Sequence, residues 1–115
     1  MLRNIPLYLL CLVFFISGCS RSSAPADRIK VSMKKYAIEP AVIHVKSGSN
    51  VQLEITTADV QHGFDVPALG IKEPVQPGKT TTVNFVAPAK GEYKIVCGVI
   101  CGPHHEDMVA KLVVD

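Results

Sequence analysis

Two thiols, a thioether and imidazole nitrogens, all of which can bind a metal, fall within twelve residues near the C-terminus. The segment reads Cys97-Gly-Val-Ile-Cys101-Gly-Pro-His104-His105-Glu-Asp-Met108, and a further imidazole, His62, lies about 35 residues earlier. Thiolate and thioether sulfurs are soft donors that favour copper, and imidazole binds copper in either oxidation state. The glycines and the proline disfavour a helix here and allow the segment to double back, which would bring its two thiols together. The segment therefore predicts a copper site on a loop.

The spacing of these residues resembles the copper A (CuA) loop of cytochrome c oxidase subunit II and of nitrous oxide reductase. The signature of that family is Cys-three residues-Cys-three residues-His-two residues-Met, with a second histidine upstream in a His-small-Phe context. Each of its positions is present here, as Cys97, Cys101, His105, Met108 and His62. The resemblance covers roughly residues 60–115.

The resemblance implies a centre of two copper ions that exchanges one electron at a time. Each cysteine would bridge both ions, and each of the two histidines would be a terminal ligand of one ion. Met108 would be a weak axial ligand of one copper, and the backbone carbonyl of Val99 would serve the other. His105 is preferred over His104 because it has the family spacing from the second cysteine.

Other interpretations of the same residues stay open. Cys97 and Cys101 could form a short structural disulfide, as an isolated cysteine pair in an exported protein often does. A single copper could use one cysteine with His62, His105 and Met108. Zinc could take the two thiolates and two imidazoles, although the methionine would then have no role.

Three features differ from the oxidase subunit. The middle residue of the cysteine loop is Val99, where the oxidase usually has a glutamate that contacts the catalytic subunit. The sequence contains no tryptophan, whereas the oxidase has a Trp-rich cluster near its cytochrome c docking surface. The paired membrane helices of the oxidase subunit are also not found. We therefore expect a protein that is not an integral subunit of an ordinary oxidase.

The N-terminal residues predict export and lipidation. Arg3 precedes an almost wholly apolar run over residues 5–16, which is too short to span a bilayer of roughly 30 Å and is typical of a secretory signal. The stretch that ends in Cys19 resembles a bacterial lipobox, which implies cleavage after residue 18 and acylation of that cysteine. An ordinary signal peptide with a chance cysteine is the alternative.

These features predict three segments. Residues 1–18 would be the signal, residues 19–27 the lipidated cysteine with a flexible tether, and residues 28–115 the folded domain. A lipid-bearing Cys19 places the domain at the periplasmic or extracytoplasmic face of a membrane. Since Cys11 would leave with the signal, the folded domain would keep only the cysteine pair of the loop.

Period-two alternation predicts an all-β domain. Apolar and polar residues alternate over residues 29–34, 42–46, 51–55, 81–86, 92–97 and 109–114, with turn signals between them. This pattern favours an antiparallel sandwich or barrel, and the resemblance implies a cupredoxin-like Greek-key form of it. Strand parity puts Cys97 on the apolar face at the end of its strand, whereas His62 lies in a turn-like segment.

The function expected is a one-electron relay whose partner is a c-type cytochrome or a terminal oxidase. A formal net charge of +2 without a basic patch gives no indication of nucleic-acid binding. No catalytic motif is present, so we expect no enzymatic activity of the chain alone. Copper storage or delivery for oxidase assembly is an alternative, and an accessory subunit of an unusual terminal oxidase is another.

Overall fold

The computed structural model describes residues 26–115. The expected signal and the lipid-bearing Cys19 lie outside the described residues. Within them, the chain forms nine strands and two short 3-10 helices. The strands are β1 (Asp27–Lys34), β2 (Ala37–Glu39), β3 (Val42–Val45), β4 (Asn50–Thr57), β5 (His62–Val66), β6 (Ile71–Val75), β7 (Thr81–Val86), β8 (Gly91–Cys97) and β9 (Val109–Val114). The helices are η1 (Pro67–Leu69) and η2 (His105–Asp107).

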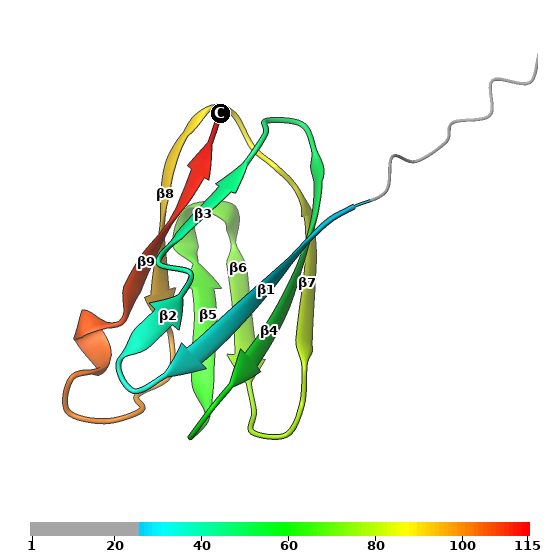
Figure 1. Ribbon diagram of the computed structural model, residues 1–115. Helices are drawn as coiled ribbons and strands as arrows, with labels where there is room; N and C mark the ends of the chain where they lie inside the picture. The colour runs from blue at the N-terminus through cyan, green and yellow to red at the C-terminus, as the bar shows by residue number, and fades with distance from the viewer. Residues whose placement is uncertain (1–25) are drawn as a thin grey trace, which may run out of the picture.

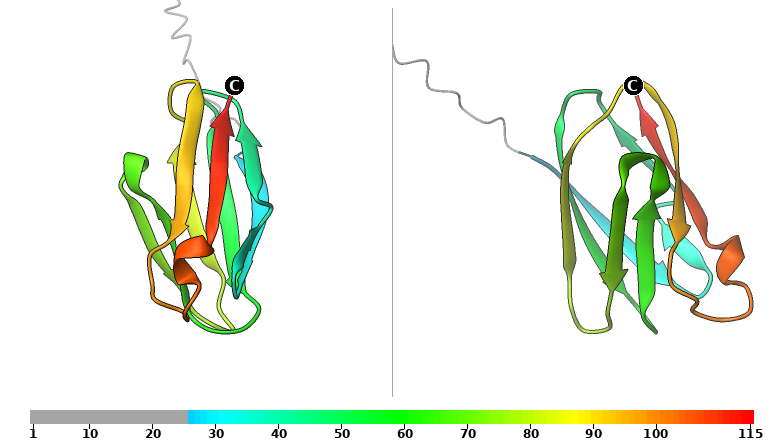
Figure 2. Two further views of the ribbon diagram at one scale, coloured as in Figure 1. Left: turned by 90° about the vertical axis from the view of Figure 1, so that its left-hand side faces the viewer. Right: turned by 180° about the vertical axis from the view of Figure 1, so that it is seen from behind.

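The strands form two sheets packed face to face (Figure 1). One sheet has the order β2-β1-β4-β7 and the other has the order β3-β9-β8-β5-β6. The left view of Figure 2 shows β8, β9 and β3 side by side in the second sheet. Two neighbouring pairs, β1 with β4 and β3 with β9, are parallel, and the other pairs are antiparallel. The expected sandwich is therefore mixed rather than purely antiparallel.

The core lies between the sheets and is built from alternate residues of each strand. In β4 the buried positions are every second residue, Val51, Leu53 and Ile55, each no more than 1% exposed. Burying an aliphatic side chain of this size stabilises the fold by about 1.5–3 kcal/mol. The facing sheet supplies further buried apolar residues, which include Ile43, Phe64, Ile95 and Leu112.

Three strands were not predicted from alternation. Strand β2 is only three residues long, and β6 contains Pro74, which is tolerated because β6 is an edge strand. In β5 four of five residues are buried, so the strand does not alternate. The prediction that His62 lies in a turn was wrong, because this residue begins β5.

Among the described residues, no helix is long and apolar enough to cross a membrane.

Replacing Ile55 by Ala should lower the free energy of unfolding by about 2–5 kcal/mol, because this side chain is completely buried and its loss leaves a cavity between the sheets. Urea unfolding of the copper-free protein measures the change. Val86→Ala is the matched control, since Val86 is 62% exposed and its truncation should change stability by no more than about 0.5 kcal/mol. Equal effects of the two substitutions would contradict the assigned core.

Candidate metal centre

The metal-binding side chains lie at one end of the sandwich, where three segments meet. Cys97 is the last residue of β8, and Met108 directly precedes β9, so these two neighbouring strands hold both ends of the ligand loop. His62 is the first residue of β5, which pairs with β8 through Phe64 opposite Cys97. The sheet therefore fixes the first cysteine and the upstream histidine relative to each other.

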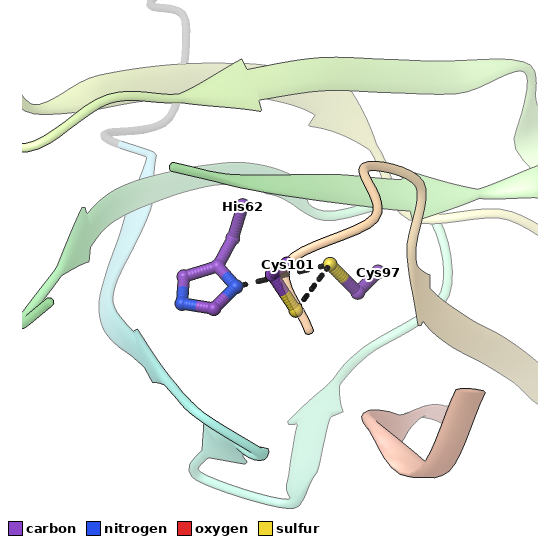
Figure 3. Close-up of side chains that lie close together, drawn as sticks. All are labelled: His62, Cys97 and Cys101. Atoms are coloured by element: carbon purple, nitrogen blue, oxygen red, sulfur yellow. Dashed lines mark hydrogen bonds between the residues drawn. The ribbon is translucent and has the colours of Figure 1, made fainter. Parts of the chain in front are cut away.

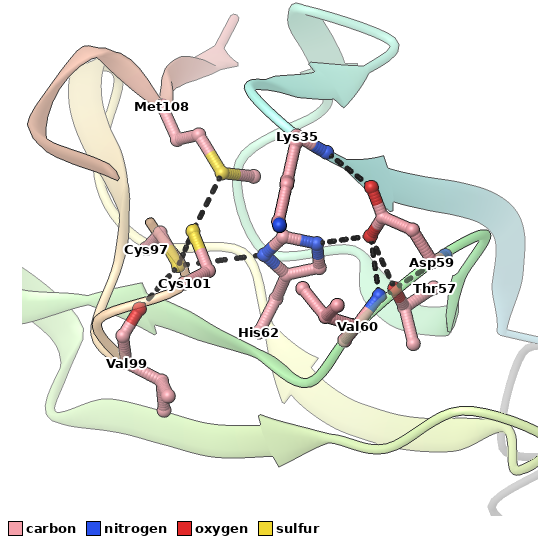
Figure 4. A network of polar contacts seen from close by, with 9 residues as sticks. All are labelled: Lys35, Thr57, Asp59, Val60, His62, Cys97, Val99, Cys101 and Met108. Atoms are coloured by element: carbon pink, nitrogen blue, oxygen red, sulfur yellow. Dashed lines mark hydrogen bonds and ion pairs between the residues drawn. The ribbon is translucent and has the colours of Figure 1, made fainter. Parts of the chain in front are cut away.

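Four of the expected side-chain ligands converge. The Nδ1 atom of His62 lies 3.9 Å from Sγ of Cys97, and this sulfur lies 3.9 Å from Sγ of Cys101 (Figure 3). The three donor atoms all lie within 4.8 Å of one another. On the other side, Sγ of Cys101 is 3.5 Å from Sδ of Met108 (Figure 4). Two thiols, an imidazole and a thioether thus form one compact cluster.

The cluster is largely removed from water. His62 and Met108 are 0% exposed, and Cys97 is 5% exposed, whereas Cys101 is partly exposed. Both cysteines are free thiols, and their 3.9 Å separation is far longer than the ~2.03–2.05 Å of a disulfide bond. Both sulfurs are therefore available as donors.

Val99 contributes its backbone at the same place. Its carbonyl oxygen lies 3.1 Å from Sγ of Cys97 and accepts the thiol proton (Figure 4). Its side chain packs on Gly63, where even a Cβ would meet Val99 at 3.0 Å. A small residue after His62 therefore lets the ligand loop lie directly on β5.

His105 and His104 have different surroundings. His105 begins η2 and lies outside the group of mutually close donors, yet its Nδ1 atom is buried and has no hydrogen-bond partner within the described chain. The side chain of His104 is 65% exposed, pairs with Asp107 at 3.4 Å and packs edge-on against Tyr36. A buried nitrogen without a partner is costly unless it binds something, and this distinguishes His105 from its neighbour.

Asp59 is a functional residue that the sequence reasoning missed. Its Oδ1 atom lies 2.7 Å from Nε2 of His62, and its Oδ2 atom accepts a 2.7 Å hydrogen bond from the backbone N–H of Lys35 (Figure 4). The Lys35 N–H, more than the contact with His62, holds the pKa of Asp59 well below its usual range. An ionised carboxylate at this position favours the tautomer of His62 that carries its proton on Nε2 and leaves Nδ1 free towards the sulfurs.

The thiol of Cys101 is held in its protonated form in the metal-free protein. Burial raises its pKa above the ordinary value, and the neighbouring Cys97 raises it further. A metal that binds this sulfur must therefore displace a proton.

The donor set suits copper. Two thiols and a thioether are soft ligands, and an imidazole whose Nδ1 faces them completes a set that copper accepts in either oxidation state. The buried, unpartnered Nδ1 of His105 is a further nitrogen on the same loop, outside the group of mutually close donors. The residues therefore fit a copper centre.

Several known proteins are similar to this chain in sequence. Residues 6–114 match the family model of the cupredoxin-like domain. Cytochrome c oxidase subunit 2 of Thermus thermophilus is 37% identical over 79 residues, which are 69% of this chain and 58% of that protein. The same subunit of Thermostichus vulcanus is 38% identical over 72 residues, which are 63% of this chain and 22% of that protein. The matched segment thus spans little more than half of one relative and about a fifth of the other.

Solved structures share the fold. The periplasmic domain of cytochrome oxidase subunit II from Bradyrhizobium japonicum superimposes with a TM-score of 0.72 at 23% identity, covering 81% of this chain and 87% of that chain. Auracyanin A, a blue copper protein from Chloroflexus aurantiacus, gives a TM-score of 0.63 at 20% identity, covering 79% of this chain and all of that one (100%).

The chain belongs to the cupredoxin-like family. Within it, the chain is related to cytochrome c oxidase subunit II, as its loop signature indicated. The expected all-β cupredoxin sandwich and the resemblance to the copper A domain are confirmed.

Replacing Asp59 by Ala should weaken copper binding about 10–100-fold, because His62 loses the acceptor that orients its ring. Asp59→Asn keeps an acceptor oxygen and should lose less. Competition with a copper chelator measures both affinities, and Asp107→Ala, which removes an exposed carboxylate from the loop, is the control. Unchanged affinity in Asp59→Ala would contradict the assigned role.

The copper-free protein should lose stability as the pH rises above about 8.5, the ordinary cysteine pKa. The pKa of Cys101 is raised in the folded chain, so the folded state binds more protons than the unfolded state in this range, and the free energy of unfolding falls with pH. Denaturant unfolding at several pH values measures the slope. Cys101→Ser should flatten it, and an equally steep slope in that variant would assign the effect to another group.

Proposed function

We propose that this chain is a one-electron carrier whose ligand loop holds a binuclear copper centre. The observation that carries the proposal is the convergence of His62, Cys97, Cys101 and Met108 in one largely buried cluster, with distances of 3.5–3.9 Å between successive donors. Soft donors and an imidazole gathered in this way can bind copper, whereas a packed apolar core has no need of them.

The ligand set proposed for two coppers comprises six residues. The two cysteine sulfurs would bridge the ions, with His62 on one copper and His105 on the other. Met108 and the carbonyl of Val99 would be weak axial ligands. The buried, unpartnered Nδ1 atom of His105 supports its inclusion, because copper binding would satisfy a nitrogen that is otherwise left without a partner.

The protein contributes rigidity and exclusion of water. The bound copper would supply the electron exchange itself. The chain keeps Cys97 and His62 in place through the pairing of β8 with β5, and Asp59 holds the imidazole ring in one orientation. Ligands that are fixed in this way move little when the charge of the metal changes, which favours fast electron transfer.

The location and the partners are part of the same proposal. A lipid on Cys19 would keep the domain at the outer face of a membrane, on a short tether. A c-type cytochrome or a terminal oxidase would be the redox partner, which the relation to cytochrome c oxidase subunit 2 supports. The oxidase activity of those longer relatives is not proposed for this chain by itself.

Electron paramagnetic resonance with copper counting on the loaded protein tests the proposal. We expect two coppers per chain and a hyperfine pattern from one electron shared by two equivalent nuclei, together with reversible reduction and reoxidation. Cys101→Ser should abolish the shared-electron pattern, because one bridging sulfur is lost. His44→Ala is the control, since His44 is exposed on β3 and its loss should leave the spectrum unchanged.

Two results would contradict this assignment. A single-copper pattern at one ion per chain would reduce the centre to that of an ordinary blue copper protein. Failure to cycle reversibly, with rapid loss of copper to a modest chelator, would favour copper storage or delivery.

A further inference from the structure

A second carboxylate lies behind the ligand loop, on the outer side of β5. Asp65 alternates with the buried residues Phe64 and Val66, so its side chain points away from the core. It stands opposite Lys72 of β6 and Val96 of β8. With Lys72 and Glu73 it lines a groove that also includes Gly98 and Val99 of the ligand loop.

The carboxylate of Asp65 occupies the space where a side chain at position 98 would lie. A Cβ added to Gly98 would overlap the carboxyl group of Asp65, with the carboxyl carbon and both oxygens as its three nearest neighbours. The φ of Gly98 is not positive, so its backbone does not itself require glycine. Position 98 therefore requires glycine because the carboxylate of Asp65 leaves no room there for a side chain.

This carboxylate makes no direct polar contact, and the charge that faces it is that of Lys72 on the neighbouring strand. Within the described residues Asp65 makes no hydrogen bond and no ion pair within 4.0 Å. Partial burial raises its pKa, and the charge of Lys72 opposes that rise. The carboxylate of Asp59, by contrast, accepts a hydrogen bond from the Lys35 N–H and pairs with His62 on the other side of the centre. Asp65 is thus a carboxylate beside the loop that makes no hydrogen bond, and Lys72 opposite it acts only from beyond ion-pair distance.

We propose that Asp65 is a positioning residue for the copper centre. Its carboxylate takes the place of a side chain at Gly98 and lies as a negative charge behind the segment from Cys97 to Val99, where it lowers the reduction potential. This inference rests on the proposed electron-transfer function. A nearby anion stabilises the oxidised centre, which carries more positive charge, relative to the reduced one. Solvent at the groove screens the effect, which limits its size.

The reduction potential of the copper-loaded protein at pH 8 tests the charge. Asp65→Asn keeps the size of the side chain and removes its charge, so the reduction equilibrium should shift severalfold towards the reduced form. The upper limit expected is about tenfold, which is about 59 mV for one electron. Glu73→Gln is the matched control, because Glu73 lines the same groove but contributes none of the three atoms nearest to a Cβ at position 98. This substitution should shift the reduction potential much less.

A double-mutant cycle tests the contact. Gly98→Ala should push the carboxylate away from the loop, and so raise the potential in the same direction as Asp65→Asn. In an Asp65→Ala background, the same Gly98→Ala substitution should have almost no effect, because the space is then free. Non-additivity of this kind is the signature of two residues in direct contact.

The melting temperature of the copper-free variants gives the same cycle without the metal. Gly98→Ala should lower the melting temperature more when Asp65 is present than in the Asp65→Ala background. Strictly additive changes in melting temperature would overturn the contact between Asp65 and Gly98. This test is valid even if the copper-loaded protein fails to transfer electrons. An unchanged or lowered potential in Asp65→Asn, in a protein that does cycle, would overturn the role of the charge.

Discussion

The structure depends on burying polar donor atoms at one end of an apolar sandwich. His62 is completely buried, and one of its ring nitrogens is paired with the carboxylate of Asp59 while the other faces sulfur. The metal-free site holds its second thiol neutral, because burial raises the pKa of Cys101. The metal-free chain thus holds thiol, thioether and imidazole donors close together in a buried cluster. Such a cluster is organised to bind a metal that replaces the thiol protons.

Strand pairing sets the precision of this arrangement. Cys97 and Phe64 face each other across β8 and β5, so a one-residue slip would turn the cysteine out of the core and Val96 into it. Met108 enters β9, which pairs with β8 along its whole length. The two ends of the ligand loop are therefore held by the same ladder, and only the middle of the loop is left for its own turns to define.

The sequence predicted the parts of the molecule that depend on local pattern. The alternating strands and the inward position of Cys97 followed from parity, and the spacing from Cys97 to Met108 predicted the cluster of sulfurs. Strand β5 escaped notice because the ligand loop covers its second face: Gly63 lies under Val99, so both faces are buried and alternation disappears. Asp59 lies three residues before His62 in the sequence, but its spacing does not predict a contact. Only the fold shows that its carboxylate pairs with the imidazole ring.

The residues between the two cysteines are fitted to the strand beneath them. Val99 supplies a carbonyl that any residue could supply, and its valine side chain packs on Gly63. Gly98 is fitted to Asp65 in a similar way. The two residues between Cys97 and Ile100 are thus both specified by contacts with β5, inside this domain. The shape of the ligand loop is therefore set in part by its own sheet.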